Sequence, residues 1–436
     1  MSSRLRAAWP LVAVFTVGHL AAYLLPTVVG RLSTGLGLTP AQAGLVGSAL
    51  LLSSATAGFG QAFLSMPVRL PFRVGATARV AHAARAPRGE RHAPRRLARL
   101  GLLLAAAGYG AAAAGYGAAA ATSAVPVVVV GTVVGGFGSG TAAAVAAAGI
   151  AAQRDPHRVS ALGLLAVSAS AGALYLTIPR LGGGHALPFA ALAAAALVMW
   201  PATRRLDGAG TRAGLTGAPE ARLPVAPLPR RRSGAVLAVT MLCWSMAQNA
   251  LWGVSGRIGV TQAGLSEVTV GAVFAVALGA GLTGVIAAGA LGARLGRAMP
   301  IGVGTVLIAG CIVVSSSARD LMSFATGEIL WNVFYPVVLS YLLGLAASLD
   351  RHGRWAVLAG SASSLGVACG PLAGSLLSEY TGYPGMGLVL CVGLLLVAVP
   401  MTAVAVHTSG RRLRPVPVPL PVPDAAPSRT AKVLAS

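Results

Sequence analysis

The sequence predicts an all-α membrane protein with twelve transmembrane helices in two six-helix halves. Its 436 residues are 56% hydrophobic and only 10% charged, with positive mean hydropathy, a composition typical of membrane proteins. The apolar residues form runs long enough to cross a bilayer, which takes about 20 helical residues. The basic residues gather in alternate connections between those runs, as expected when positive charge is retained on one side of a membrane.

The predicted spans fall into two sets of six, separated by a basic connection. They are 8–29, 40–64, 99–121, 125–150, 159–179 and 185–203 in the N-terminal half (1–203), then 235–256, 267–291, 299–317, 321–346, 355–378 and 384–406 in the C-terminal half (235–406). Segment 204–234 is rich in Gly, Pro and Arg and predicts a flexible cytoplasmic loop. The Pro-rich tail, 407–436, is expected to be disordered and cytoplasmic.

The basic residues also predict the orientation in the membrane. With both termini in the cytoplasm, 29 of the 33 basic residues lie in cytoplasmic segments, and Arg31, Arg180, Arg257 and Arg319 lie one in each of four outer loops. We therefore expect a multi-pass monomer in the inner (cytoplasmic) membrane, in contact with anionic headgroups. The net charge of +23 does not indicate nucleic acid, because it is not gathered on a soluble basic face.

An internal repeat relates the two halves. Residues 38–44 (LTPAQAG) open the second predicted span, and residues 265–271 (LSEVTVG) open the eighth, 227 positions later. Each segment has at its second position a hydroxyl residue suited to cap a helix, and Thr39 and Gln42 have the spacing of a capping box. The halves are therefore expected to be parallel duplicates.

The most specific local motif lies between the eighth and ninth spans, where the chain reads GALGARLGR. Glycines permit a tight turn there, and arginines bind helix ends and acidic partners. The matching positions are Gly289, Arg294, Gly296 and Arg297.

Together with the twelve spans and the basic central loop, this motif resembles the inner-loop signature of the major facilitator superfamily of secondary transporters. The resemblance covers residues 8–406. The signature's acidic position is Ala293 here, so the ion pair usual in that family is missing. The fourth span has the glycines of another family motif, with Thr132 near the place of its buried arginine.

Glu328 alone among the ten acidic residues lies well inside a predicted span. At helical spacing it shares a face with Trp331, Asn332 and Tyr335. A carboxylate at this depth normally faces a bundle interior or a water-filled path and serves a substrate or an ion. The alternative is a protonated carboxyl that holds two helices together.

The family resemblance implies a central cavity lined by the first, fourth, seventh and tenth spans. Polar side chains concentrate in three of these four. The candidate substrate- and proton-binding residues are His19, Tyr23, Gln248, Asn249, Glu328, Trp331, Asn332 and Tyr335. The tryptophans of these spans are candidates to stack on an apolar substrate or to anchor span ends at the membrane surface.

The eleventh span contains a glycine-proline motif. Gly366, Gly370 and Gly374 are four residues apart, and Pro371 lies among them. Small residues at this spacing let helix backbones touch, and proline bends a helix. The motif predicts either a bending, sliding helix pair or ordinary helix packing.

These features predict a proton-coupled exporter of a small organic compound, such as a drug or secondary metabolite. An importer or facilitator of a nutrient such as a sugar is the alternative on the same fold, and a non-transporting membrane sensor is a third. No buried arginine is expected, which favours a weakly polar or cationic substrate. The sequence has no nucleophile with a base, no metal cluster and no nucleotide loop, so neither an enzyme nor a cofactor or metal is expected.

Overall fold

A computed structural model describes residues 3–65, 93–118, 124–153, 155–182, 184–206, 229–292, 294–350 and 354–409. Most of the predicted central loop (204–234) and tail (407–436), and Ala293 of the inner-loop motif, lie outside the described residues. The described part of the chain is helical and contains no strand.

The helices follow the predicted spans closely. The N-terminal half contains α1 (Ser3–Tyr23), α2 (Leu25–Leu36), α3 (Pro40–Ser65), α5 (Ala93–Ala118), α6 (Val125–Ala151), α7 (Pro156–Thr177) with the short 3-10 helix η3 (Ile178–Leu181), and α8 (Leu187–Met199) with η4 (Trp200–Arg205). The C-terminal half contains α10 (Arg231–Arg257) with the π-helical turn η5 (Ile258–Gln262), α11 (Glu267–Leu291), α12 (Ala298–Ser316), α13 (Leu321–Leu349) and α14 (Arg354–Ser409).

These helices are consistent with twelve spans. Ten of them are long and apolar enough to cross a membrane, and α1 with α2 forms an eleventh span that is bent by 47°. Helix α14 has 56 residues, about 84 Å at 1.5 Å per residue, which is far more than one bilayer crossing. It turns at Gly382, whose φ of 69° and ψ of 172° are not helical, and so supplies two spans.

The break between α1 and α2 has a local cause. Pro26 lies in the first turn of α2 and has no backbone N–H. Ala22, four residues earlier, therefore keeps a free carbonyl, and this oxygen accepts a hydrogen bond of 3.1 Å from Trp252 Nε1 of α10. The bend thus provides an acceptor for the opposite half.

Polar side chains cap the first turns of several helices, two of them at positions that the sequence predicts. Thr39 and Gln42 form the expected capping box, with bonds of 3.0 and 3.2 Å, and Ser266 caps α11 by accepting from Thr269 N at 3.2 Å. Asp320 caps α13, and its bonds to the first turn hold its pKa below the usual range. Both predicted caps of the repeat are confirmed.

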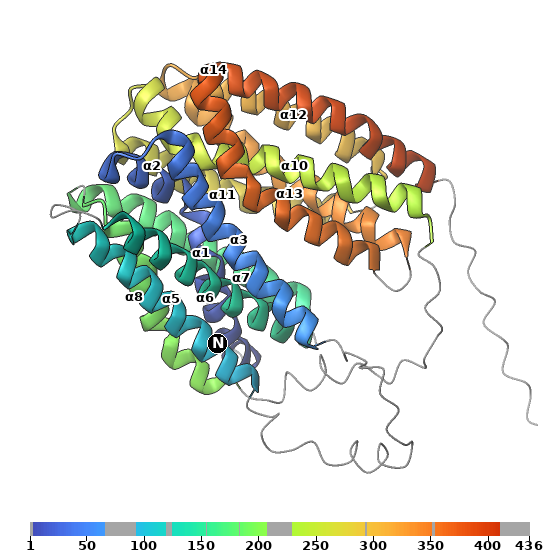
Figure 1. The fold of residues 1–436 in the computed structure, drawn as a ribbon. Coiled ribbons are helices and arrows are strands. Elements are labelled where there is room, and N and C mark those ends of the chain that lie inside the picture. Colours follow the sequence, from blue (N-terminus) through green and yellow to red (C-terminus); the bar gives the residue numbers. More distant parts are fainter. Residues whose placement is uncertain are drawn as a thin grey trace, which may run out of the picture.

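The two halves meet through matched pairs of helices. Helix α2 packs on α10, α3 on α14, and α7 on α11. We call the end of the bundle where α2 ends the α2 end, and the end where the described chain begins and finishes the terminal end. Figure 1 shows the halves side by side at the α2 end and diverging toward the terminal end.

Glycine contacts agree with this divergence. Near the α2 end, a Cβ added at Gly44 would lie 2.7 Å from the Pro371 carbonyl oxygen of the other half, and one added at Gly271 would lie 2.2 Å from that of Tyr175. Farther toward the terminal end of α3, a Cβ at Gly58 would meet nothing within 4 Å. The halves are therefore closed against each other at the α2 end.

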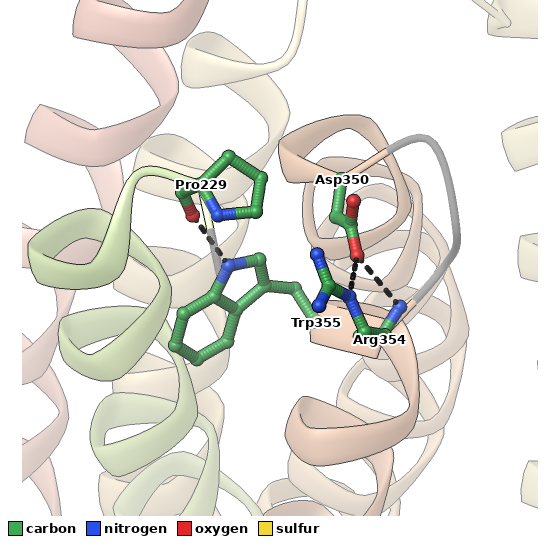
Figure 2. A network of polar contacts seen from close by, with 4 residues as sticks. All are labelled: Pro229, Asp350, Arg354 and Trp355. Atoms are coloured by element: carbon green, nitrogen blue, oxygen red, sulfur yellow. Dashed lines mark hydrogen bonds and ion pairs between the residues drawn. The ribbon is translucent and has the colours of Figure 1, made fainter. Parts of the chain in front are cut away.

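At the terminal end, separate contacts hold the C-terminal half together (Figure 2). Asp350, at the end of α13, accepts hydrogen bonds from the Arg354 side chain at 2.7 Å and its backbone N–H at 3.3 Å. Trp355 Nε1 donates to the Pro229 carbonyl at 2.8 Å, which ties α14 to the start of α10. These bonds connect three helices of one half and none of the other.

Candidate functional site

Glu328 lies inside the C-terminal half, between three helices. Its side chain is completely buried on α13. Its Oε1 atom is 2.8 Å from Ser255 Oγ of α10 and 2.6 Å from Ser315 Oγ of α12, whereas its Oε2 atom is buried without a hydrogen-bond partner. The carboxyl group therefore has one satisfied and one unsatisfied oxygen.

The Ser255 hydroxyl makes this arrangement compatible with two protonation states. Its oxygen lies within hydrogen-bond distance of two acceptors, Glu328 Oε1 at 2.8 Å and the Leu251 carbonyl at 3.0 Å, but one hydroxyl has a single proton to donate. An ionised Glu328 accepts that proton. A protonated Glu328 donates to Ser255 Oγ instead, and the serine then donates to Leu251.

Next to the carboxyl group, aromatic rings form a continuous stack through the C-terminal half. Trp244 stacks on Tyr335 at 5.3 Å between ring centroids, Tyr335 contacts Trp331 at 5.7 Å, and Trp331 stacks on Trp252 at 5.6 Å. Phe274 of α11 continues the series 5.2 Å from Trp252. The three tryptophans are buried, so they pack on neighbouring rings and do not anchor span ends at the membrane surface.

The predicted amides lie beside this aromatic stack. Gln248 is fully buried; its Oε1 accepts a hydrogen bond from Trp331 Nε1, and its Nε2 has no partner. Asn249 bonds to the Ser245 carbonyl at 3.0 Å, and Asn332 bonds to the backbone carbonyl of Glu328, not to its carboxyl group. Gln248 thus leaves a buried donor unused, as Glu328 leaves an acceptor.

The predicted residues of the N-terminal half lie on α1. His19 is 3.0 Å from the Phe15 carbonyl oxygen and stacks on the Phe15 ring at 4.1 Å. The Tyr23 carbonyl accepts a 2.7 Å bond from the Tyr175 hydroxyl, and the Tyr175 ring lies 5.0 Å from Phe274 of the aromatic stack. Thr132 of α6 bonds to its own helix at Val128. The structure therefore connects Tyr23 to the aromatic stack through Tyr175 but gives His19 no contact with Glu328.

The inner-loop motif forms the expected tight turn. Gly292 and Gly296 have φ of 46° and 65°, a region that glycine adopts without strain. Arg297 donates a 2.6 Å bond to Ser348 Oγ of α13, whereas Arg294 and Gly289 are exposed. The turn thus links the start of α12 to the end of α13.

The glycine-proline motif packs α14 on α10. A Cβ added at Gly366 or Gly374 would lie 2.2 or 2.1 Å from a backbone carbonyl oxygen of α10, and one at Gly370 would lie 2.5 Å from Asn249 Cβ. Pro371 lies 2.9 Å from a Cβ added at Gly253 of α10 and 3.5 Å from one added at Gly47 of the opposite half. The glycines face a helix of their own half, and the proline lies between that helix and the opposite half.

Three of the four arginines predicted for outer loops lie in helices, and two of these are buried, which corrects that prediction. Arg31 belongs to α2 and Arg257 ends α10, and they are only 6% and 8% exposed. Arg31 pairs with Glu267 of α11, and Arg257 donates to Ser375 of α14 at 3.2 Å. The expectation that the chain buries no arginine was therefore wrong, because α2 and α10 extend beyond the apolar runs and turn these side chains inward.

Comparison with known proteins identifies the fold. No family model and no curated protein matches this sequence. Among solved structures, a D-xylose-proton symporter has a TM-score of 0.68 at 14% identity, over 94% of this chain and 100% of that chain. The human organic anion transporter MFSD10 (TETRAN) has 0.59 at 17%, over 92% and 100%. The POT family transporter PepTSo has a TM-score of 0.68 at 11% identity, over 93% of this chain and 99% of that chain.

This chain has the fold of major facilitator superfamily transporters. The similarity covers nearly the whole chain, so it includes both halves and the boundary between them. The predicted fold and its family resemblance are therefore confirmed, whereas the roles of the site residues are a separate question.

Proposed function

We propose that this chain is a secondary active transporter that exports a small organic compound in exchange for protons. The observation that carries the proposal is Glu328, a fully buried carboxyl group whose surroundings accept both of its protonation states. A group of this kind inside a membrane is suited to carry a proton. The printed description of one structural neighbour as a proton symporter supports proton coupling on this fold.

The proposed transport mechanism is alternating access, in which the central groups are exposed to one side of the membrane at a time. The halves touch at the α2 end through α2, α3 and α7 on one side and α10, α14 and α11 on the other. Parting at that end while closing at the terminal end would expose the same central groups to each side of the membrane in turn. The aromatic stack and the free Gln248 amide lie beside Glu328, and an organic molecule would contact them once the halves part.

The test is transport by the purified protein in liposomes with an imposed pH gradient and a panel of organic compounds. Glu328→Gln keeps the size of the side chain and its hydrogen bonding but cannot change charge. We expect it to abolish accumulation driven by the pH gradient and to leave exchange down a substrate gradient intact. If the Gln variant still accumulates substrate in response to pH, Glu328 is not the coupling group.

Asp320→Asn is the matched control. Asp320 caps the same helix outside the membrane, and asparagine is an equally good cap. This variant removes one carboxylate from α13 without touching the buried site, so its pH-driven transport should equal that of the wild type. The direction of the flux in the same assay distinguishes export from nutrient import.

A further inference from the structure

A pocket lies between the halves at the α2 end, and Phe274 belongs both to its wall and to the aromatic stack next to Glu328. Its cavity volume is about 90 Å³, below the roughly 300–1,000 Å³ of pockets for drug-sized ligands, so only a small molecule fits. Helices α2, α7, α10 and α11 all contribute to it. Its apolar wall includes Tyr175, Val270 and Phe274, and its charged groups are Arg31, Arg257 and Glu267.

Arg257 is the most informative of these groups. It is 8% exposed, and its Nε atom is buried without a hydrogen-bond partner, although one terminal nitrogen donates to Ser375. Glu379 and Tyr383 interact with it electrostatically, but among the described residues no carboxylate lies within 4 Å of it. A buried guanidinium with an unused donor favours an added acceptor, and an anion forms the strongest such bond.

The balance of charge in the pocket also favours an anion. Two arginines and one glutamate line it, and Glu267 is paired with Arg31. Glu379 acts on Arg257 from outside the lining and accepts from Ala41 N, so among the described residues Arg257 is the one lining charge without an ion pair. The two arginines come from opposite halves and are one residue away from equivalent positions in the repeat. An anion bound at Arg257 would therefore lie where the two halves meet.

We propose that this pocket binds the carboxylate of a small organic acid, with Arg257 as the primary binding residue and the Tyr175 and Phe274 rings against the apolar part. A carboxylate matches the planar fork of an arginine and can accept from Nε and a terminal nitrogen together. The inference rests on the proposed function and narrows it, since it names organic acids as the class of compound carried.

The test uses three probes: benzoate, neutral benzamide and cationic benzylamine. Each has a single aromatic ring and they differ in charge, so comparing them separates the effect of charge from that of shape. Binding to the full-length protein in detergent is measured as the rise of Tm with probe concentration. Benzoate should raise the Tm of the wild type, and the other two should not. Arg257→Gln should weaken the benzoate effect by about tenfold or more, the usual loss when a charge-assisted bond is removed, and Arg257→Lys should weaken it less.

Arg319→Gln is the control, because Arg319 lies outside the helices and does not line the pocket; it should bind benzoate as the wild type does. No benzoate effect on the wild type, or an undiminished effect in both Arg257 variants, would overturn the site. The wild-type comparison of three probes remains decisive if Arg257→Gln does not fold. Benzoate binding without benzoate flux would count against the proposed transport, and flux of other compounds without benzoate binding would count against the site alone.

Discussion

The protonation state of Glu328 sets the direction of the hydrogen bond between its Oε1 atom and Ser255. Ser315 and Ser255 both reach Oε1, and Ser255 has the Leu251 carbonyl as its second acceptor. The ionised form gains a charge-assisted bond from Ser255, whereas the protonated form gains only a neutral bond to it. Charge-assisted bonds contribute about 1.5–3 kcal/mol and neutral bonds about 1 kcal/mol. Ser255 therefore stabilises the ionised form more than the protonated form.

Ser255→Ala should consequently move the pH of half-maximal transport upward. The ionised carboxyl group loses more than the protonated one, and a difference of about 1.4 kcal/mol corresponds to one pH unit. We expect a shift of about one unit in a pH profile of proton-driven flux, with little change in the maximal rate. Thr240→Ala is the control, because that hydroxyl bonds only to backbone carbonyls of α10. A downward shift, or equal shifts in both variants, would contradict this account of Glu328.

At the scale of helices, glycines make two different kinds of contact. Gly370 of α14 faces α10 within one half, whereas Gly44 and Gly271 face helices of the opposite half. The last two are equivalent positions in the repeat, which places one glycine on each side of the closed α2 end. A side chain at Gly370 would push apart α10 and α14, which belong to the same half. A side chain at Gly271 would push apart the two halves, which move relative to each other in the proposed transport cycle.

Gly271→Ala should therefore impair closure more than folding. The added Cβ would lie 2.2 Å from the Tyr175 carbonyl oxygen, so the α2 end would open to relieve the overlap. We expect slower transport and faster labelling of a single cysteine at Thr34, which lines the pocket there, with folded yield near that of the wild type. Gly370→Ala should instead lower Tm, because overpacking inside a core typically costs about 1–3 kcal/mol. If Gly271→Ala and Gly370→Ala lower the folded yield equally, the two glycines do not differ in role and this account is wrong.

Sequence patterns predict the helices better than they predict what the helices bring together. Apolar runs and caps locate α11 at 267–291, as the structure has it, because span length and capping are local properties. The burial of Arg31 and Arg257 could not be predicted from hydropathy, since tertiary contacts carry their helices past the apolar runs. Ser255 and Ser315 were likewise missed, because intramembrane serines are common and only packing places these two beside Glu328.

Across the whole molecule, few polar contacts between described residues join the two halves. The Arg31–Glu267 pair, the Ser48 hydroxyl bonded to Leu372 N at 2.9 Å, and Glu379 bonded to Ala41 N at 3.0 Å all cross the boundary between the halves. They are few polar contacts at one end of the bundle, so the boundary can part without disrupting either half. The predicted orientation, with the terminal end in the cytoplasm, would make this an inward-open state.

A cross-link between α7 and α11 tests whether that parting belongs to the transport cycle. A Cβ added at Gly172 would lie 3.7 Å from Ala275 Cβ, within the 3.5–4.5 Å typical of disulfides. In a variant whose native Cys243, Cys311, Cys369 and Cys391 are replaced, Gly172→Cys with Ala275→Cys should form a disulfide under mild oxidation and arrest flux in liposomes. A reductant should restore flux, and neither single variant should respond to oxidant. Because the link joins one helix of each half, arrest would mean that these helices separate in every cycle; full activity of the oxidised protein would place the movement elsewhere.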